Sequence, residues 1–168
     1  MKTRVVALAL LAWALAGAVA IADEGGAHRI GAGANYWVTV EDMEADVDEN
    51  GFAYLATYQY RPGLLGLGID VEMLPDFLGE DAYAPQAYLI LGKTIYAAAG
   101  VGILNVDGDW ADDPFYSLRA GLDLNLLSNL YLDLYGNYRF EETSDLGGED
   151  TEIDADTVFL GAALRLAL

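Results

Sequence analysis

Apolar and polar residues alternate with a period of two along most of the chain, and no sustained helical stripe interrupts this pattern. Four long polar breaks, at 39–51, 74–82, 105–114 and 141–155, alternate strictly with three short turns, at 62–63, 92–94 and 126–129. These divide the chain into eight segments that we expect to be strands: about 28–38, 52–61, 64–73, 83–91, 95–104, 115–125, 130–140 and 156–168. An average strand in a soluble protein has about 5–6 residues, whereas a tilted strand that crosses a bilayer needs about 9–11. The segment lengths therefore favour membrane-crossing strands.

The two faces of these strands differ in character. In the third segment Leu65, Leu67 and Val71 share one face, while Asp70 and Glu72 share the other. The first, sixth, seventh and eighth segments divide in the same way, whereas the fourth and fifth are too apolar on both sides to assign. The polar faces also carry most of the strand glycines: Gly31, Gly33, Gly66, Gly68, Gly121 and Gly161.

Small residues suit a crowded, concave interior, and long Leu and Ile faces suit lipid. Backbone hydrogen bonding in lipid then requires a closed sheet. The sequence therefore predicts an all-β protein, an eight-stranded antiparallel up-and-down transmembrane β-barrel. Aromatic residues near the strand ends fit interfacial girdles, although core packing explains some of them equally well, Trp37 in particular: Tyr36, Trp37, Tyr54, Tyr60, Tyr83, Trp110, Phe115, Tyr116, Tyr138 and Phe140.

Charged residues on the polar faces predict the content of the lumen. Every arginine after residue 28 falls on such a face, together with four carboxylates: Arg29, Arg61, Asp70, Glu72, Arg119, Asp123, Asp133, Arg139 and Arg165. An unpaired buried charge is costly, so this near balance predicts a salt-bridged polar network. The network could be a structural plug or a gate in an ion path. Eight strands leave no continuous aqueous channel, which favours the plug.

The N-terminal residues form a separate unit. Lys2 and Arg4 precede an apolar run from Val5 to Ala22 that ends in small residues before Asp23. We expect a signal peptide at 1–22 and an outer-membrane β-barrel domain at 23–168. The alternative, a membrane-spanning helix, is disfavoured because the run is rich in Ala and no positive anchor follows it.

Composition excludes several classes of partner and of chemistry. The chain has 27 acidic and 8 basic residues, a formal net charge of -19, which disfavours nucleic acid as a partner. It has no Cys, which excludes disulfides, thiol catalysis and Cys-ligated metals. Most carboxylates lie in the four long breaks, where they solvate the loops or bind divalent cations that bridge to lipid phosphates. Residues 46–51 match the first half of a calcium loop, but Thr57 stands where the bidentate Glu belongs.

Nucleophilic catalysis would need a Ser–His pair within hydrogen-bond reach. The chain has one histidine, His28, and three serines, Ser117, Ser128 and Ser144. The expected topology places His28 at the rim of the short turns and Ser117 near the opposite rim, roughly 20 Å or more away. We therefore expect no catalytic residues, no enzymatic activity and no cofactor.

The number, length and turn alternation of the segments resemble the small eight-stranded outer-membrane barrels of the OmpA transmembrane-domain, OmpX and opacity-protein type. Gly161, Leu164, Leu166 and Leu168 loosely follow the C-terminal strand of such barrels, which typically ends in an aromatic residue. The resemblance implies location in the bacterial outer membrane, contact with lipid and lipopolysaccharide, and insertion by the barrel-assembly machinery. It favours a non-catalytic envelope-structural or surface-interaction role. The alternatives are a narrow pore or passage for small hydrophobic solutes and, less favoured, a lipid A-modifying enzyme.

Overall fold

Residues 27–39, 50–77, 80–141 and 157–168 are described by a computed structural model of the chain. The expected signal peptide, most of the calcium-loop pattern and much of two acidic breaks lie outside these residues. Among the described residues, no helix is long and apolar enough to cross a membrane.

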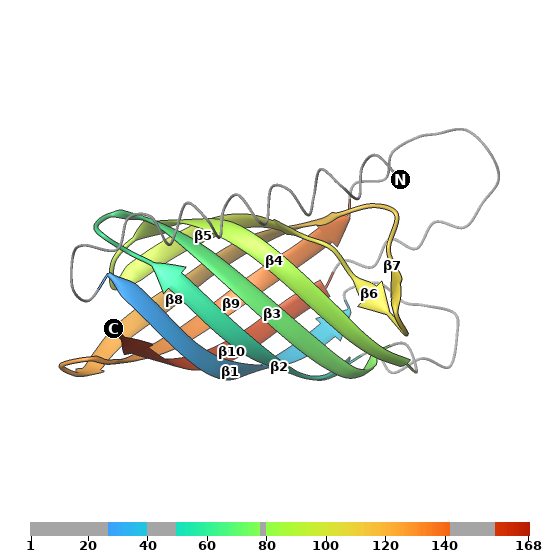
Figure 1. Cartoon of the computed structure of the whole chain (residues 1–168), viewed down its shortest axis with the longest axis horizontal. Coiled ribbons are helices and arrows are strands. Elements are labelled where there is room, and N and C mark those ends of the chain that lie inside the picture. Colours follow the sequence, from blue (N-terminus) through green and yellow to red (C-terminus); the bar gives the residue numbers. More distant parts are fainter. Residues whose placement is uncertain (1–26, 40–49, 78–79, 142–156) are drawn as a thin grey trace.

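Eight long antiparallel strands form a closed barrel, as the sequence predicted (Figure 1). They are β1 (His28–Thr39), β2 (Asn50–Tyr60), β3 (Leu65–Phe77), β4 (Glu80–Gly92), β5 (Ile95–Gly102), β8 (Phe115–Leu127), β9 (Leu130–Glu141) and β10 (Thr157–Ala167). Each pairs with its neighbour in the chain, β1 pairs with β10, and the β3–β4 ladder completes the ring. The short turns gather at one end of the barrel, here called the turn end, and the opposite end, which carries the connection between β5 and β8, is called the loop end (Figure 1).

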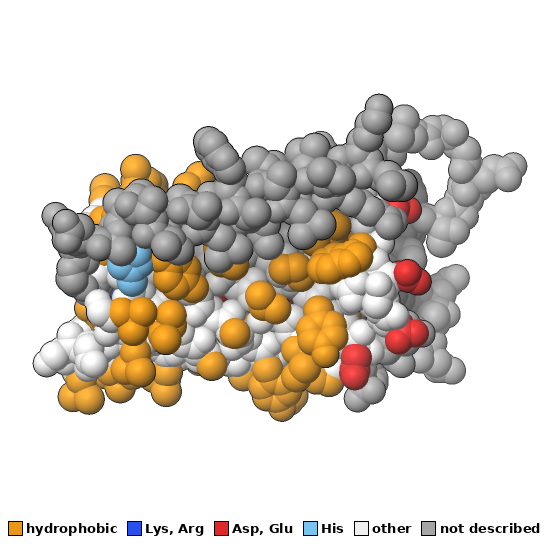
Figure 2. Space-filling view, viewed as in Figure 1, with side chains coloured by type: hydrophobic (Ala, Val, Ile, Leu, Met, Phe, Trp, Pro, Cys, Tyr) orange, Lys and Arg blue, Asp and Glu red, His pale blue; other side chains and the backbone are white. Residues whose placement is uncertain are grey.

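The outer surface of the barrel is apolar. Alternate residues of β3 point outward, and Leu65, Leu67 and Val71 are each more than 40% exposed, while Asp70 and Glu72 are fully buried. The burial pattern confirms the assigned faces of β1, β8, β9 and β10 in the same way. Hydrophobic side chains cover the visible flank, and the acidic side chains in view gather at the loop end (Figure 2).

The faces of β4 and β5, which the sequence left open, are decided by packing. Gln86, Tyr88 and Ile90 of β4 point inward, as do Tyr96 and Ala98 of β5. Side chains fill the interior of a small barrel at close-packed density, and apolar side chains can do this as well as polar ones. The inward face of these two strands can therefore be largely apolar.

Glycines in the wall make room for large inward side chains of the next strand. Gly68 lies directly opposite Tyr88, Gly121 opposite Tyr96, and Gly161 opposite Tyr135. A Cβ atom at Gly121 would lie 2.7 Å from the Tyr96 ring, so any side chain there would displace the ring. Inward aromatic rings occupy the space that side chains at these positions would need, which accounts for the glycines on the inner face.

One sequence expectation at the loop end is wrong, and a second break contains an element that the pattern did not predict. The expected break at 74–82 is mostly strand, because Leu74 pairs with Ala82 and both are buried, with a register shift before Phe77. The expected break at 105–114 contains a short hairpin of β6 (Asn105–Val106) and β7 (Asp109–Trp110). Polar residues end a strand's apolar pattern without ending its backbone pairing, since side chains at the rim reach water while the ladder continues.

Candidate functional site: the barrel lumen

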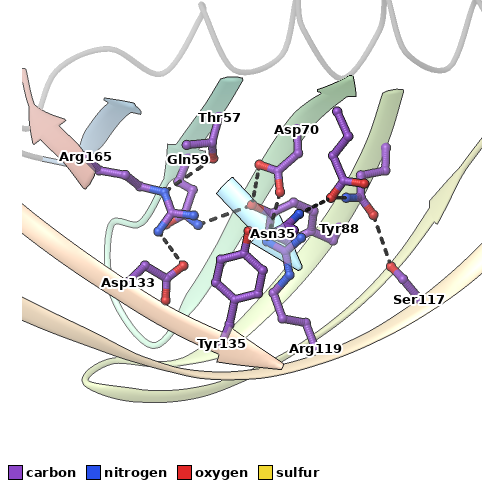
Figure 3. A network of polar contacts seen from close by, with 12 residues as sticks. Asn35, Thr57, Gln59, Asp70, Tyr88, Ser117, Arg119, Asp133, Tyr135 and Arg165 are labelled. Atoms are coloured by element: carbon purple, nitrogen blue, oxygen red, sulfur yellow. Dashed lines mark hydrogen bonds and ion pairs between the residues drawn. The ribbon is translucent and has the colours of Figure 1, made fainter. Parts of the chain in front are cut away.

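The centre of the lumen holds a carboxylate–arginine pair surrounded by tyrosines (Figure 3). Asp70 of β3 and Arg119 of β8 form an ion pair of 2.9 Å across the barrel. Tyr88 donates a 2.9 Å hydrogen bond to the same carboxylate. The Arg119 guanidinium also lies over the rings of Tyr88 and Tyr135, at 4.6 Å and 4.3 Å from their centroids. Cation–π contacts and a hydrogen-bonded carboxylate together offset the cost of burying both charges.

A second pair lies nearer the loop end. Arg139 of β9 binds the Glu72 carboxylate at 2.6 Å. Asn35 donates to the other oxygen of Glu72 at 2.9 Å, and Gln86 donates to that oxygen at 3.2 Å. Glu72 is fully buried, so these donors replace the water that it loses on folding.

A third pair lies between neighbouring strands. Arg165 of β10 and Asp133 of β9 form an ion pair in which both side chains are fully buried. The Tyr96 hydroxyl lies 2.9 Å from each Asp133 oxygen, and Arg165 donates from Nε to Thr57 at 3.3 Å. This cluster connects four strands, β2, β5, β9 and β10, through side chains alone.

At the turn end two arginines share one carboxylate. Arg29 and Arg61 both donate to Oδ2 of Asp123. Arg61 also donates to the backbone carbonyls of Gly92 and Lys93, at 2.9 Å and 2.8 Å, and thereby ties the β4–β5 turn to the end of β2. Arg29, the least buried of the five arginines in the lumen, lies over the Tyr131 ring at 3.6 Å.

An apolar cluster, here called the plug, fills the loop end of the lumen. Its members are buried residues of six strands together with two partly buried side chains that pack against them: Trp37, Ala53, Leu74, Ala82, Ala84, Phe115 and Phe159, with Leu104 and Val106. Phe115, one of the aromatic residues for which the sequence allowed a girdle or a core position, thus points inward, where Gly102 opposite it leaves space for the ring. The Arg139 guanidinium contacts the rings of Phe115 and Phe159, at 4.0 Å and 4.3 Å. It therefore joins the plug to the polar network.

The structure places all nine charged residues named from the sequence inside the barrel, eight of them buried and Arg29 partly buried. Each makes at least one ion pair. Sequence reasoning missed the uncharged hydrogen-bonding partners on strands whose faces it did not assign: Thr57, Gln59, Gln86, Tyr88 and Tyr96. Gln86, the one polar side chain near the middle of β4, was the available signal for the inward face of that strand.

Among the described residues, no serine side chain meets His28 to form the Ser–His pair that nucleophilic catalysis would need. His28 accepts from or donates to the Tyr58 hydroxyl at 2.7 Å through Nδ1, on the outer flank of the turn end (Figure 2). Ser117 is buried in the lumen, where its hydroxyl lies 3.5 Å from Oε1 of Gln86. Ser128 lies in the β8–β9 turn, and Ser144 lies outside the described residues. In the part of the chain that the structure describes, no group of three or more acidic or His side chains could hold a metal ion.

No protein-family model and no curated protein matches the sequence. Solved structures do match the fold. Neisserial surface protein A aligns with a TM-score of 0.64 and 15% identity, over 87% of this chain and 100% of that one. The N-terminal β-barrel domain of Pseudomonas aeruginosa OprF aligns with a TM-score of 0.55 and 11% identity, over 86% and 100%. The outer-membrane protein OprG of the same organism aligns with a TM-score of 0.54 and 15% identity, over 86% and 98%.

These likenesses are in fold, since every identity is low. A closed sheet with an apolar outer surface satisfies the two conditions that a lipid environment sets. The chain is therefore a small eight-stranded barrel of the outer-membrane type.

Proposed function

We propose that this protein is a non-catalytic integral outer-membrane barrel with a sealed lumen, which holds acidic loops at the cell surface in an envelope-structural or surface-interaction role. The observation that carries the proposal is the filling of the lumen. The plug occupies the loop end, and ion pairs run from Glu72–Arg139 to Asp123 at the turn end.

The charge distribution supports the surface role. All six Lys and Arg side chains of the described residues are in the lumen or in the β4–β5 turn. Exposed carboxylates occur at the loop end, including Asp107, Asp109 and Asp113. Short turns face the periplasm in barrels of this kind, so the acidic end faces outward. There it meets lipopolysaccharide, with divalent cations between carboxylates and lipid phosphates, after insertion by the barrel-assembly machinery.

Conductance across a planar lipid bilayer tests the sealed lumen. We expect the wild-type barrel to be silent, because removing its filling would require breaking several buried ion pairs. Lys93→Ala, a change in the exposed turn outside the lumen, serves as the matched control and stays silent. Steady channels in the wild type would overturn the proposal in favour of a narrow pore.

Two lumen variants distinguish a purely structural filling of the lumen from a gate in an ion path. Arg119→Ala and Arg139→Ala each remove one cation from the filling. Conductance that appears in either variant would mean that the filling blocks a latent path, whereas silence in both means that the lumen is structural throughout.

The lipid A-modifying alternative has its own test. Purified barrel incubated with lipid A should release no fatty acid and transfer no acyl chain. Activity that His28→Ala abolishes would contradict the non-catalytic proposal, and activity unchanged in that variant would contradict it without involving His28.

A further inference from the structure

We propose that the β6–β7 hairpin is a movable lid over the plug, held closed by Leu104 and Val106 and loosened by its own negative charge when ionic strength is low. The inference goes beyond the sealed barrel proposed above, because it concerns the outer surface of the plug and not the ion pairs beneath it.

The hairpin is attached to the barrel wall along one edge. Within the described sheet, β6 and β7 pair with each other, and β6 pairs with β4 through Ala82–Val106 and Tyr83–Asn105. The β5–β8 ladder ends at Gly102 and Phe115, so from Ile103 onward the chain has left β8. An element paired along one edge by so few residues opens at lower free energy than the wall strands.

A proline weakens that edge further. Ile103 donates from its backbone N–H to the carbonyl of Pro85 at 3.1 Å. In an antiparallel ladder the N–H and C=O of one residue face the same neighbour, but Pro85 has no N–H to return the bond. The two residues that follow Gly102 are accordingly irregular, and they form the junction between wall and hairpin.

Two apolar side chains at the root of the hairpin hold it over the plug. Leu104 and Val106 pack against the buried cluster that contains Trp37, Phe115 and Phe159. The Leu104 carbonyl accepts a 2.8 Å hydrogen bond from the N–H of Ala111, which fastens the returning chain to the same point. Trp37 is 1% exposed in this closed arrangement. Lifting the hairpin removes Leu104 and Val106 from the plug and gives water access to its aromatic rings.

The charge of the hairpin opposes its pairing with β4, because the exposed Asp107 stands opposite the exposed Asp81, whose carbonyl accepts its backbone N–H at 3.3 Å. Residues 105–114 contain four aspartates and no Lys or Arg, and Asp107, Asp109 and Asp113 are exposed. Such repulsion is largely screened at an ionic strength of 0.1 M, where the Debye length is about 10 Å, and acts over about 30 Å at 0.01 M. The balance between apolar packing and repulsion therefore shifts towards opening as salt is diluted.

Trp37 fluorescence reports lid opening once Trp110→Phe has removed the tryptophan of the hairpin. Trp37 is then the only tryptophan between residues 23 and 168. The barrel is placed in lipid vesicles, and quenching by acrylamide is measured, because this quencher is uncharged and its own concentration does not change with salt. We expect the quenching constant to rise when ionic strength falls from about 0.1 M to about 0.01 M. An unchanged constant would overturn the proposal.

A disulfide lock gives the matched control. Ala82 and Val106 are directly opposite each other, and the backbone bonds at Ile103 and Asp107 place them in a non-hydrogen-bonded pair. Such pairs have Cα atoms about 4.5 Å apart, within the range that a disulfide spans. The chain has no cysteine of its own, so Ala82→Cys with Val106→Cys gives one defined bond. We expect the salt-dependent rise when this variant is reduced and its loss when it is oxidised. An equal rise in both forms would mean that water reaches Trp37 by another route and would overturn the lid.

Neutralising the hairpin tests the charge effect separately. Asp107→Asn, Asp109→Asn and Asp113→Asn together should abolish the rise at low salt, and Asn tolerates the positive φ of 48° at position 107. A full rise in this variant would overturn the electrostatic part of the proposal. Heat-dependent gel mobility confirms that each variant forms a closed barrel. The lid is tested by Trp37 quenching and the sealed lumen by conductance. Failure of the lid proposal therefore does not count against the sealed lumen.

Discussion

The plug and the polar network fill the same lumen in two different ways. Trp37, Leu74 and Phe159 at the loop end are as completely buried as Asp70, Glu72 and Arg165 further inside. The plug relies on shape, since its members gain from leaving water wherever they pack. Each carboxylate of the network needs its own donors in place. The network is therefore the region where one substitution leaves a partner without compensation, whereas the plug loses only contacts and volume.

The largest effect is expected from breaking the network at its most buried pair. Arg165→Ala leaves Asp133 fully buried without its cation, at a cost of about 3–5 kcal/mol in the free energy of unfolding. Urea unfolding in lipid vesicles measures this cost. The double variant Arg165→Met with Asp133→Leu should recover most of it, because the unpaired charge is then absent. A double variant as unstable as the single one would contradict the electrostatic account.

A cavity in the plug should cost somewhat less. Leu74→Ala removes a fully buried side chain and is expected to lower the free energy of unfolding by about 2–5 kcal/mol, towards the lower end if the plug collapses into the space. Leu74→Met, which keeps the volume, is the control and should cost less than about 1.5 kcal/mol. Equal losses in the two variants would mean that volume does not decide the stability of the plug.

Arg139 sharpens the comparison because it belongs to both regions. Arg139→Lys keeps the charge opposite Glu72 but loses the planar group that contacts Phe115 and Phe159. We expect a loss of about 2 kcal/mol, the value of a desolvated cation–π contact. If the lysine variant unfolds at the same urea concentration as the wild type, the stacking contributes nothing.

The smallest effect is expected at a network position without hydrogen bonds. Asn137 is 2% exposed, and within the described residues neither of its amide atoms makes a hydrogen bond. Asn137→Leu has nearly the same shape and removes two buried polar atoms, so stability should change little or increase. A marked loss of stability would assign Asn137 a polar role in the lumen.

Prediction of the strand faces from sequence succeeded where polarity and geometry agree. The five arginines and four carboxylates could be assigned to the inner face because the residues one position away are apolar, apart from His28 beside Arg29. Prediction failed where the polarity of a residue and its position in the barrel disagree. Residues 74–82 look like a polar loop, yet Leu74 and Ala82 are the inward residues of paired strands. Phe115 at a strand end looks like a girdle residue, yet it closes the lumen.

The sequence by itself determined the strand number, the up-and-down order and the outward apolar surface, because these follow from local alternation and from the length of the connections. Only the tertiary structure decided which arginine meets which carboxylate. Arg119 and Asp70 come from strands on different sides of the barrel, and Arg29 and Arg61 converge on Asp123, 94 and 62 residues away. Such pairings depend on strand register and tilt around the whole ring. Register is set by the fit of rings over glycines and by the filling of the interior, which no single strand contains.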